Sequence, residues 1–402
     1  MTLVARFFVG DIPVLISDAL LSTPAPLNTG SIALPSIRSS EKYHGDAPTT
    51  MAGVVQKMTL IEENAVLCFA GDYTLGQEVL NYLKRLLKEG TPPAVAWDTM
   101  KEHFSLNGSS GLELIFEAMH PTGDGHLSLV SKSIGLGRGE KEYRLYSEAI
   151  FAGSGAELAK KLLTEGSHGV APQIDGKYEL AVQRALHVVA ELLDMDMRGG
   201  GSFDKHFGGF YEIAIWYGNR FKKIDGVQFV YWSIDIGEEN STLRLDRILL
   251  QHYQGETLCV DEVLVDESTP EKISLTSEQR LPISNVLHHR IPPLSQGYES
   301  QEFQINSLTH FQHKLTVHCC RISAYNGFTT TGTIISGTIQ SPSESETVKV
   351  GEYDITLAKD IGRFLQKHLV TSMENYTTTM DADIHANGRS MATRIKDFFG
   401  VL

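Results

Sequence analysis

Hydrophobic and polar positions along the first 235 residues follow two spacings. Short apolar runs bounded by turn residues predict strands, and the first two runs, with Gly10 and Asp11 between them, predict a hairpin. Apolar residues at helical spacing, such as Leu75, Val79 and Leu83, predict helices. We expect strands at 3–9, 12–17, 54–61, 65–70, 111–119, 126–134, 142–152, 208–216 and 226–235. We expect helices at 75–89, 94–105, 156–165 and 178–195, and a long loop over 22–50.

The order of these elements bears on the fold class. Strands come in groups rather than alternating strictly with helices, which disfavours a parallel doubly wound sheet and favours two antiparallel sheets between layers of helices. The remainder of the chain differs in character, with strand-rich segments at 242–266 and 313–340 and helical segments at 358–370 and 388–400. We therefore expect an N-terminal domain over residues 1–236 and a C-terminal mixed α/β domain of unknown role over residues 237–402.

Charge and composition exclude some classes of partner. The chain of 402 residues has a formal net charge of -14, which disfavours a nucleic acid or an anionic membrane as its main partner. No apolar run reaches the ~18 residues of a membrane helix, and the N-terminus lacks the basic segment and apolar core of a signal peptide. None of the four cysteines has zinc-ligand spacing. We expect a cytoplasmic protein.

Thr2 is a candidate nucleophile because of its position. A methionine that precedes a small residue is commonly removed, and removal of Met1 leaves one residue with both a hydroxyl and a primary α-amine. An α-amine has an unperturbed pKa of ~7.7–8.0, so it can accept a proton near neutral pH, where a lysine ordinarily cannot. The simpler interpretation is an ordinary second residue, and the surrounding sequence has to decide between the two.

Three later residues could complete such a site. Asp18 ends the second predicted strand, where a carboxylate is suited to pair with a buried cation. Lys57 has apolar neighbours, so its charge requires a partner, and beside a hydroxyl it would favour the alkoxide. Gly71 closes a strand before a helix, where its N–H could stabilise an oxyanion. The simpler interpretations are a turn cap, a surface lysine and a turn glycine.

The intervals between these residues resemble those of N-terminal-nucleophile hydrolases of the proteasome type, namely proteasome β-subunits, HslV and the Anbu proteins. In that family an Asp ends a strand sixteen residues after the nucleophile, as Asp18 follows Thr2. A Gly of the oxyanion hole follows the catalytic Lys by fourteen residues, as Gly71 follows Lys57. The resemblance covers about residues 2–235.

Two later motifs extend the resemblance. Gly153-Ser154-Gly155 is similar to the Gly-Ser-Gly that opens a helix in the family, and the segment from Asp204 to Gly209 is similar to its Asp-x-x-Ser-Gly-Gly. Ser154 without a catalytic role would be the N-cap of a helix, and Asp204 would be a turn carboxylate.

The resemblance implies a four-layer α-β-β-α sandwich and amide hydrolysis through an acyl ester on Thr2. It implies that Lys57 lowers the pKa of the hydroxyl, that Asp18 orients Lys57, and that the Gly71 amide holds the oxyanion. The complete site that it implies consists of Thr2, Asp18, Lys57 and Gly71, with Ser154 and Asp204 tuning the amine. It implies no metal and no organic cofactor.

The family also suggests partners. Peptides or unfolded proteins are the expected substrates, with a small-molecule amide as an alternative. A homo-oligomer is expected, because family members assemble into a chamber that encloses their active sites. An ATP-dependent unfoldase or another protein partner would deliver substrate to that chamber.

The sequence departs from the family in ways that support a rival hypothesis. Phe207 stands where the family usually has a Ser that helps to hold the amine, and Leu20 stands where it commonly has an Arg. The interval from Asp18 to Lys57 is longer than in the family, which makes the 22–50 loop an insertion. The rival is a catalytically silent, proteasome-like subunit that serves as a scaffold or binds a partner.

Other residues carry weaker hypotheses. His206 beside Asp204 could be a base, although the family uses no His there. The glycine-rich segment 135–139 is better explained by a hairpin than by phosphate binding, because it opens no predicted helix. The pairs His288/His289 and His310/His313 lack a convincing complement of metal ligands.

Overall fold

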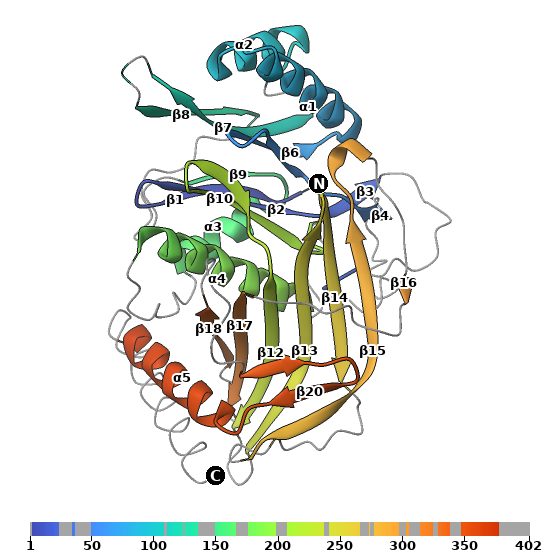
Figure 1. The fold of residues 1–402 in the computed structure, drawn as a ribbon, viewed down its shortest axis with the longest axis vertical. Helices are drawn as coiled ribbons and strands as arrows, with labels where there is room; N and C mark the ends of the chain where they lie inside the picture. The colour runs from blue at the N-terminus through green and yellow to red at the C-terminus, as the bar shows by residue number, and fades with distance from the viewer. Residues whose placement is uncertain are drawn as a thin grey trace.

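The computed structural model describes a chain rich in strands with few helices, and the expected mixed α and β organisation is confirmed (Figure 1). Asp204, His206, His310, His313 and the expected helix at 388–400 lie outside the described residues. The described residues are 2–23, 34–36, 50–107, 111–122, 124, 126–135, 149–165, 176–197, 207–236, 241–265, 273, 277–296, 303–304, 314–324, 329–337 and 347–377.

The first sheet is built around the N-terminal hairpin. Its two strands pair antiparallel with Val9 opposite Ile12, so the expected hairpin is confirmed. Gly10 in the turn has a φ of 63°, which a glycine adopts without a steric penalty. The sheet has the order β11-β10-β2-β1-β9. Its strands are β1 (Val4–Val9), β2 (Ile12–Asp18), β9 (Ala149–Ala152), β10 (Tyr211–Tyr217) and β11 (Arg220–Lys223).

A second sheet carries the first two helices. It has the order β5-β6-β7-β8, with β5 (Met58–Ile61), β6 (Ala65–Gly71), β7 (Leu112–Pro121) and β8 (Leu127–Ile134). The helices are α1 (Tyr73–Lys88) and α2 (Pro93–His103). Asp72 caps α1 by accepting from the N–H of Leu75, and the apolar side chains of both helices pack with Phe69 and Leu114 of the sheet.

The two sheets face each other, and each has helices on its outer side (Figure 1). Leu15 and Ala214 of the first sheet share an apolar cluster with Cys68 and Ile115 of the second. On its other face the first sheet packs against α3 (Ala156–Glu165) and α4 (Lys177–Met197). Because successive side chains of a strand point to opposite faces of the sheet, one strand of the first sheet contributes side chains both to the contact with the second sheet and to the contact with the helices.

A larger sheet begins with β12 and contains most of the strands that follow the first two sheets. Its path is β18-β17-β12-β13-β14-β15-β20-β19, with β16 paired to β15. The β3–β4 pair, the helix α5 and the short helix η3 lie outside these three sheets. The bounds are β3 (Leu20–Thr23), β4 (Thr50–Val54), β12 (Val227–Ile236), β13 (Ser241–Gln254), β14 (Thr257–Val265), β15 (Gln279–Ile291), β16 (Phe303–Gln304), β17 (Leu315–Ala324), β18 (Thr329–Gly337), β19 (Val348–Val350), β20 (Asp354–Leu357), α5 (Ile361–Thr377) and η3 (Leu294–Gln296).

Helix α4 joins the larger sheet to the first sheet. All residues from 185 to 194 of this helix are buried, as expected of a helix that is covered on every side. The same apolar cluster contains residues of α4, of β1 and β2, and of β12, β14 and β17. No described helix is both long enough and apolar enough to span a membrane.

The division after residue 236 stays a prediction, and the topology offers a test of it. Strand β12 lies on the N-terminal side of that division, yet it pairs with β13 in antiparallel and with β17 in parallel orientation. A chain that ends at residue 236 therefore keeps β12 and loses both of its neighbours. We expect that chain to be insoluble, because it would expose an apolar strand with two open edges. A soluble, monomeric product with a cooperative thermal transition would contradict this expectation and support a boundary at 236.

Candidate active site

Lys57 connects Thr2 to Asp18 in the described structure. Its Nζ lies 2.9 Å from the Thr2 Oγ1 and 2.9 Å from the Asp18 Oδ1. Thr2 precedes β1, Asp18 ends β2, and Lys57 lies between β4 and β5. The β1–β2 hairpin brings the first two together, since the N–H of Asp18 donates to the carbonyl of Leu3. The structure thus joins three of the residues that the sequence singled out.

The Asp18 carboxylate is held by two backbone groups as well as by Lys57. Oδ1 accepts from the N–H of Leu3 at 2.9 Å, and Oδ2 accepts from the N–H of Gly208 at 2.9 Å. Three donors therefore fix the carboxylate, and through it the position of the ammonium. Lys57 itself is anchored by its carbonyl, which accepts from the N–H of Phe69 on β6 at 3.1 Å.

Burial controls the protonation of this group of residues. Thr2 is 1% exposed, Lys57 1% and Asp18 0%. Burial lowers the pKa of Lys57, and the Asp18 carboxylate opposes that shift. Burial likewise raises the pKa of Asp18, against the effect of the Lys57 ammonium. A lysine with a lowered pKa parts with a proton more readily than an exposed one, which suits it to exchange protons with a neighbouring hydroxyl.

The glycines around Ser154 pack on the backbone of Thr2. The N–H of Gly155 donates to the carbonyl of Thr2 at 3.1 Å. Gly153 has a φ of 80°, and a Cβ added to it would lie 2.0 Å from the same carbonyl oxygen. Ser154 itself is half-buried and lies between β9 and α3. This motif therefore lies beside the Thr2 carbonyl, and the close approach requires a glycine at position 153.

Replacement of Gly153 by Ala tests this close approach. We expect Gly153→Ala to lower the free energy of unfolding by about 3 kcal/mol or more, because it combines a left-handed backbone conformation with a clash against Thr2. Gly10→Ala is the matched control: its φ is 63° but no atom lies within 4 Å of the added Cβ, so only about 1–2 kcal/mol is expected. Urea unfolding of both variants measures the difference, and equal losses would contradict the packing.

Gly71 lies at the end of β6 and is exposed. Its φ is 106°, and an added Cβ would lie 2.1 Å from the carbonyl oxygen of Gly111. The approach of Gly111 therefore explains a glycine at this position without reference to an oxyanion. Gly71 is the last residue of β6, the strand whose Phe69 N–H donates to the carbonyl of Lys57, so it lies on an element of the site.

A second layer of polar residues lies beneath Asp18, and no sequence pattern indicates it. Asp196 of α4 accepts from the hydroxyl of Tyr211 at 3.2 Å and from that of Ser36 at 3.3 Å. A Cβ added to Gly208 would lie 2.8 Å from the Asp196 Oδ2, so this carboxylate packs under the peptide that binds Asp18. Burial and the carboxylates of Asp196 and Asp18 raise the pKa of Tyr211 well above its usual value.

Phe207 is completely buried in the apolar cluster of the first sheet and α4. The aromatic ring of Phe207 is therefore part of the core. The proteasome-type family that the sequence resembles usually has a serine hydroxyl at this position. Of the histidine pairs named as weak metal-ligand candidates, His288 and His289 are described, and both lie near carboxylates: His288 Nδ1 lies 2.7 Å from Asp261, and His289 Nε2 lies 3.8 Å from Glu262. Within the described ranges no three His, Cys, Asp or Glu side chains could hold a metal ion together.

Comparisons with known proteins give a distant likeness. No protein-family model matches the chain, and no curated protein matches it. Among solved structures, eukaryotic HslV from Trypanosoma brucei aligns at 14% sequence identity with a TM-score of 0.30. The alignment covers 53% of this chain and 98% of the HslV chain. Because the identity and the TM-score are so low, the chemistry has to be argued from the contacts of this chain alone.

Proposed function

We propose that this chain is an N-terminal-nucleophile amide hydrolase of the proteasome type, with Thr2 as its nucleophile once Met1 is removed. One observation carries the proposal: the buried Lys57 ammonium donates to the Thr2 hydroxyl and to the Asp18 carboxylate, at 2.9 Å each. Burying a lysine and a carboxylate is unfavourable unless the geometry is good, and perturbed ionisable groups cluster at functional sites. The two facing sheets with helices outside them are consistent with the four-layer sandwich of such enzymes.

In the proposed reaction the Thr2 Oγ1 forms a bond to the carbonyl carbon of a peptide, and its proton passes to the free α-amine. The Lys57 ammonium stabilises the negative charge that develops on the oxygen, and the N–H of Gly71 donates to the oxyanion. The peptide C–N bond then breaks, and the proton moves from the α-ammonium to the leaving amine. Water, activated by the same amine, hydrolyses the ester on Thr2. As the family resemblance implies, Ser154 and Asp204 would tune the amine.

A covalent adduct tests the proposal directly. The purified chain is analysed by intact mass for the loss of Met1 and is then incubated with a peptide that ends in an electrophilic group. We expect one adduct for each processed chain, and peptide mapping should locate it on the N-terminal Thr2. An adduct on another residue, or none on a chain that has lost Met1, would overturn the assignment.

A catalytically silent subunit is the second candidate, and two observations favour it. Thr2 is 1% exposed, and Phe207 fills the core where the family has a hydroxyl beside the amine. In this case the Thr2–Lys57–Asp18 contacts would only stabilise the N-terminal hairpin. Retention of Met1 on the whole purified population would decide for this candidate, because Thr2 would then have no free amine.

Assembly is part of the same proposal. A homo-oligomer would seclude the site, and an unfoldase or other protein partner would deliver unfolded substrate. Sedimentation at micromolar concentration measures this, and a chain that stays monomeric would contradict a compartmental protease without excluding hydrolysis of small peptides.

A further inference from the structure

A pocket of about 300 Å³ lies beside the segment that carries Lys57, between the N-terminal and C-terminal parts of the described chain. Its walls come from β5, α1, the turn after β11, the β13–β14 turn and the segment that leads into η3. The pocket has room for about ten water molecules and lies at the lower end of the ~300–1,000 Å³ range of small-molecule sites. The proposed hydrolysis does not use this pocket. Gln56 lines the pocket, whereas the next residue, Lys57, is not part of the lining and contacts Thr2 instead.

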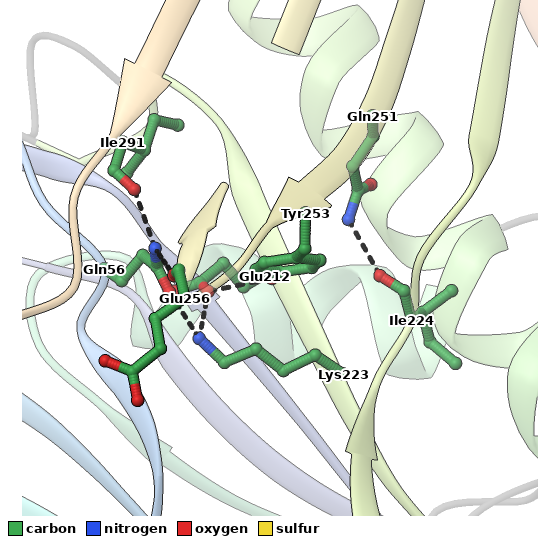
Figure 2. Close-up of polar contacts among 8 residues, drawn as sticks. All are labelled: Gln56, Glu212, Lys223, Ile224, Gln251, Tyr253, Glu256 and Ile291. Carbon is green, nitrogen blue, oxygen red and sulfur yellow. Dashed lines mark hydrogen bonds and ion pairs between the residues drawn. The ribbon is translucent and has the colours of Figure 1, made fainter. Parts of the chain in front are cut away.

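Polar groups on one side of this pocket are fixed by hydrogen bonds (Figure 2). Lys223 Nζ donates to the Gln56 Oε1 at 2.6 Å and to the Glu212 Oε1 at 2.5 Å. The hydroxyl of Tyr253 donates to the same Glu212 oxygen at 3.0 Å, and Gln56 Nε2 donates to the carbonyl of Glu256 at 2.7 Å. This side of the pocket is therefore rigid, and the charge of Lys223 is already compensated by Glu212.

Three charged side chains of the lining, Lys84, Asp225 and Glu256, form no ion pair within the described part of the chain. Lys84 lies on α1 and Glu256 in the β13–β14 turn. These two are therefore too far apart to pair with each other. Asp225 follows β11, and its carboxylate accepts from the N–H of Tyr253 at 2.9 Å. The surface around these charged groups includes Leu60, Pro293 and the ring of Tyr253. The lining of the pocket thus includes one ammonium and two carboxylates without ion pairs, on a largely apolar wall.

We propose that this pocket binds a dipeptide-sized zwitterion with apolar side chains. The carboxylate of the ligand would pair with Lys84, its ammonium with Glu256, and its side chains would cover Leu60 and Pro293. A simple anion would bring its charge toward the carboxylates of Asp225 and Glu256, and a simple cation would leave the Lys84 ammonium without a partner. Only a molecule with both charges matches both walls. This site is independent of the proposed hydrolysis, since Thr2 does not line it.

Calorimetric titration of the full chain with the dipeptide Leu-Leu tests the proposal. We expect saturable binding of one dipeptide per chain. The same dipeptide with an acetylated N-terminus and an amidated C-terminus keeps the apolar body and loses both charges, so we expect it to bind about tenfold more weakly or worse. Equal affinity for the two peptides, or no binding of Leu-Leu at millimolar concentration, would overturn the proposal.

Variants locate the binding site. Lys84→Met and Glu256→Gln should each weaken Leu-Leu binding by about tenfold, because each removes one charge of the pair. Lys88→Met is the control, as Lys88 lies one turn further along α1 and is not part of the lining. Thr2→Val should bind Leu-Leu with unchanged affinity. Loss of binding in Thr2→Val would place the dipeptide in the candidate active site, and an equal effect of Lys84→Met and Lys88→Met would also contradict the proposal.

Discussion

Thr2→Val is expected to reduce hydrolysis of a fluorogenic peptide to background while the chain stays folded. Valine has nearly the shape of threonine but no hydroxyl, so the buried site is filled and only the nucleophile is removed. Removal of a catalytic nucleophile costs on the order of 10⁶-fold in rate. Thr2→Ser should retain measurable activity, because serine supplies a hydroxyl and also permits the removal of Met1. The rates are compared at equal concentration of folded chain.

Thermal unfolding supplies the control for this comparison. Thr2→Val deprives Lys57 of one acceptor and leaves its ion pair with Asp18 in place, so a loss of stability of about 1–3 kcal/mol is expected. Thr333→Val is the matched variant: Thr333 is buried and its hydroxyl makes no hydrogen bond in the described structure, so neither activity nor stability should fall. Undiminished hydrolysis by purified Thr2→Val would move the chemistry to another residue.

The elements that sequence patterns predicted well are those stabilised by local contacts. The hairpin of β1 and β2 is specified by two apolar runs and a glycine turn, and α1 by its spacing of apolar residues and the Asp72 cap. Lys57 could be singled out because a charge among apolar residues requires a partner. The pairing of Lys57 with Asp18 needed the family intervals in addition, since 39 residues separate the two side chains.

Contacts between distant segments could not be predicted in this way. Asp196 accepts from Ser36 across 160 residues, and nothing in the pattern of α4 distinguishes that carboxylate from a solvent-exposed one. The parallel pairing of β12 with β17 likewise depends on which strand edges remain open once the sheets have formed. The pocket beside Gln56 is lined by several segments, so no single stretch of sequence could indicate it.

Lys57→Met is expected to destabilise the chain strongly. Methionine has a similar length and no branch, so packing is largely kept, but the Asp18 carboxylate is left buried with only the N–H groups of Leu3 and Gly208 as partners. Removing one partner of a buried ion pair costs about 3–5 kcal/mol. Lys177→Met is the matched control: Lys177 also pairs with an aspartate, Asp11, but this pair is exposed, so the midpoint of urea unfolding should hardly change.

The pH dependence of the Lys57→Met variant identifies the charge that causes the loss. Burial already raises the pKa of Asp18 above 3.8, and removal of the ammonium raises it further, because the ammonium opposes the shift. When the pKa of Asp18 is higher in the folded than in the unfolded chain, the folded chain binds the proton more tightly. The free energy of unfolding therefore falls as the pH rises through the folded-state pKa. The deficit relative to the unchanged chain should therefore be smaller at about pH 4.5 than at about pH 7.5. An equal deficit at both values would show that Asp18 stays ionised without Lys57, and the buried pair would then have no part in setting the protonation of the site.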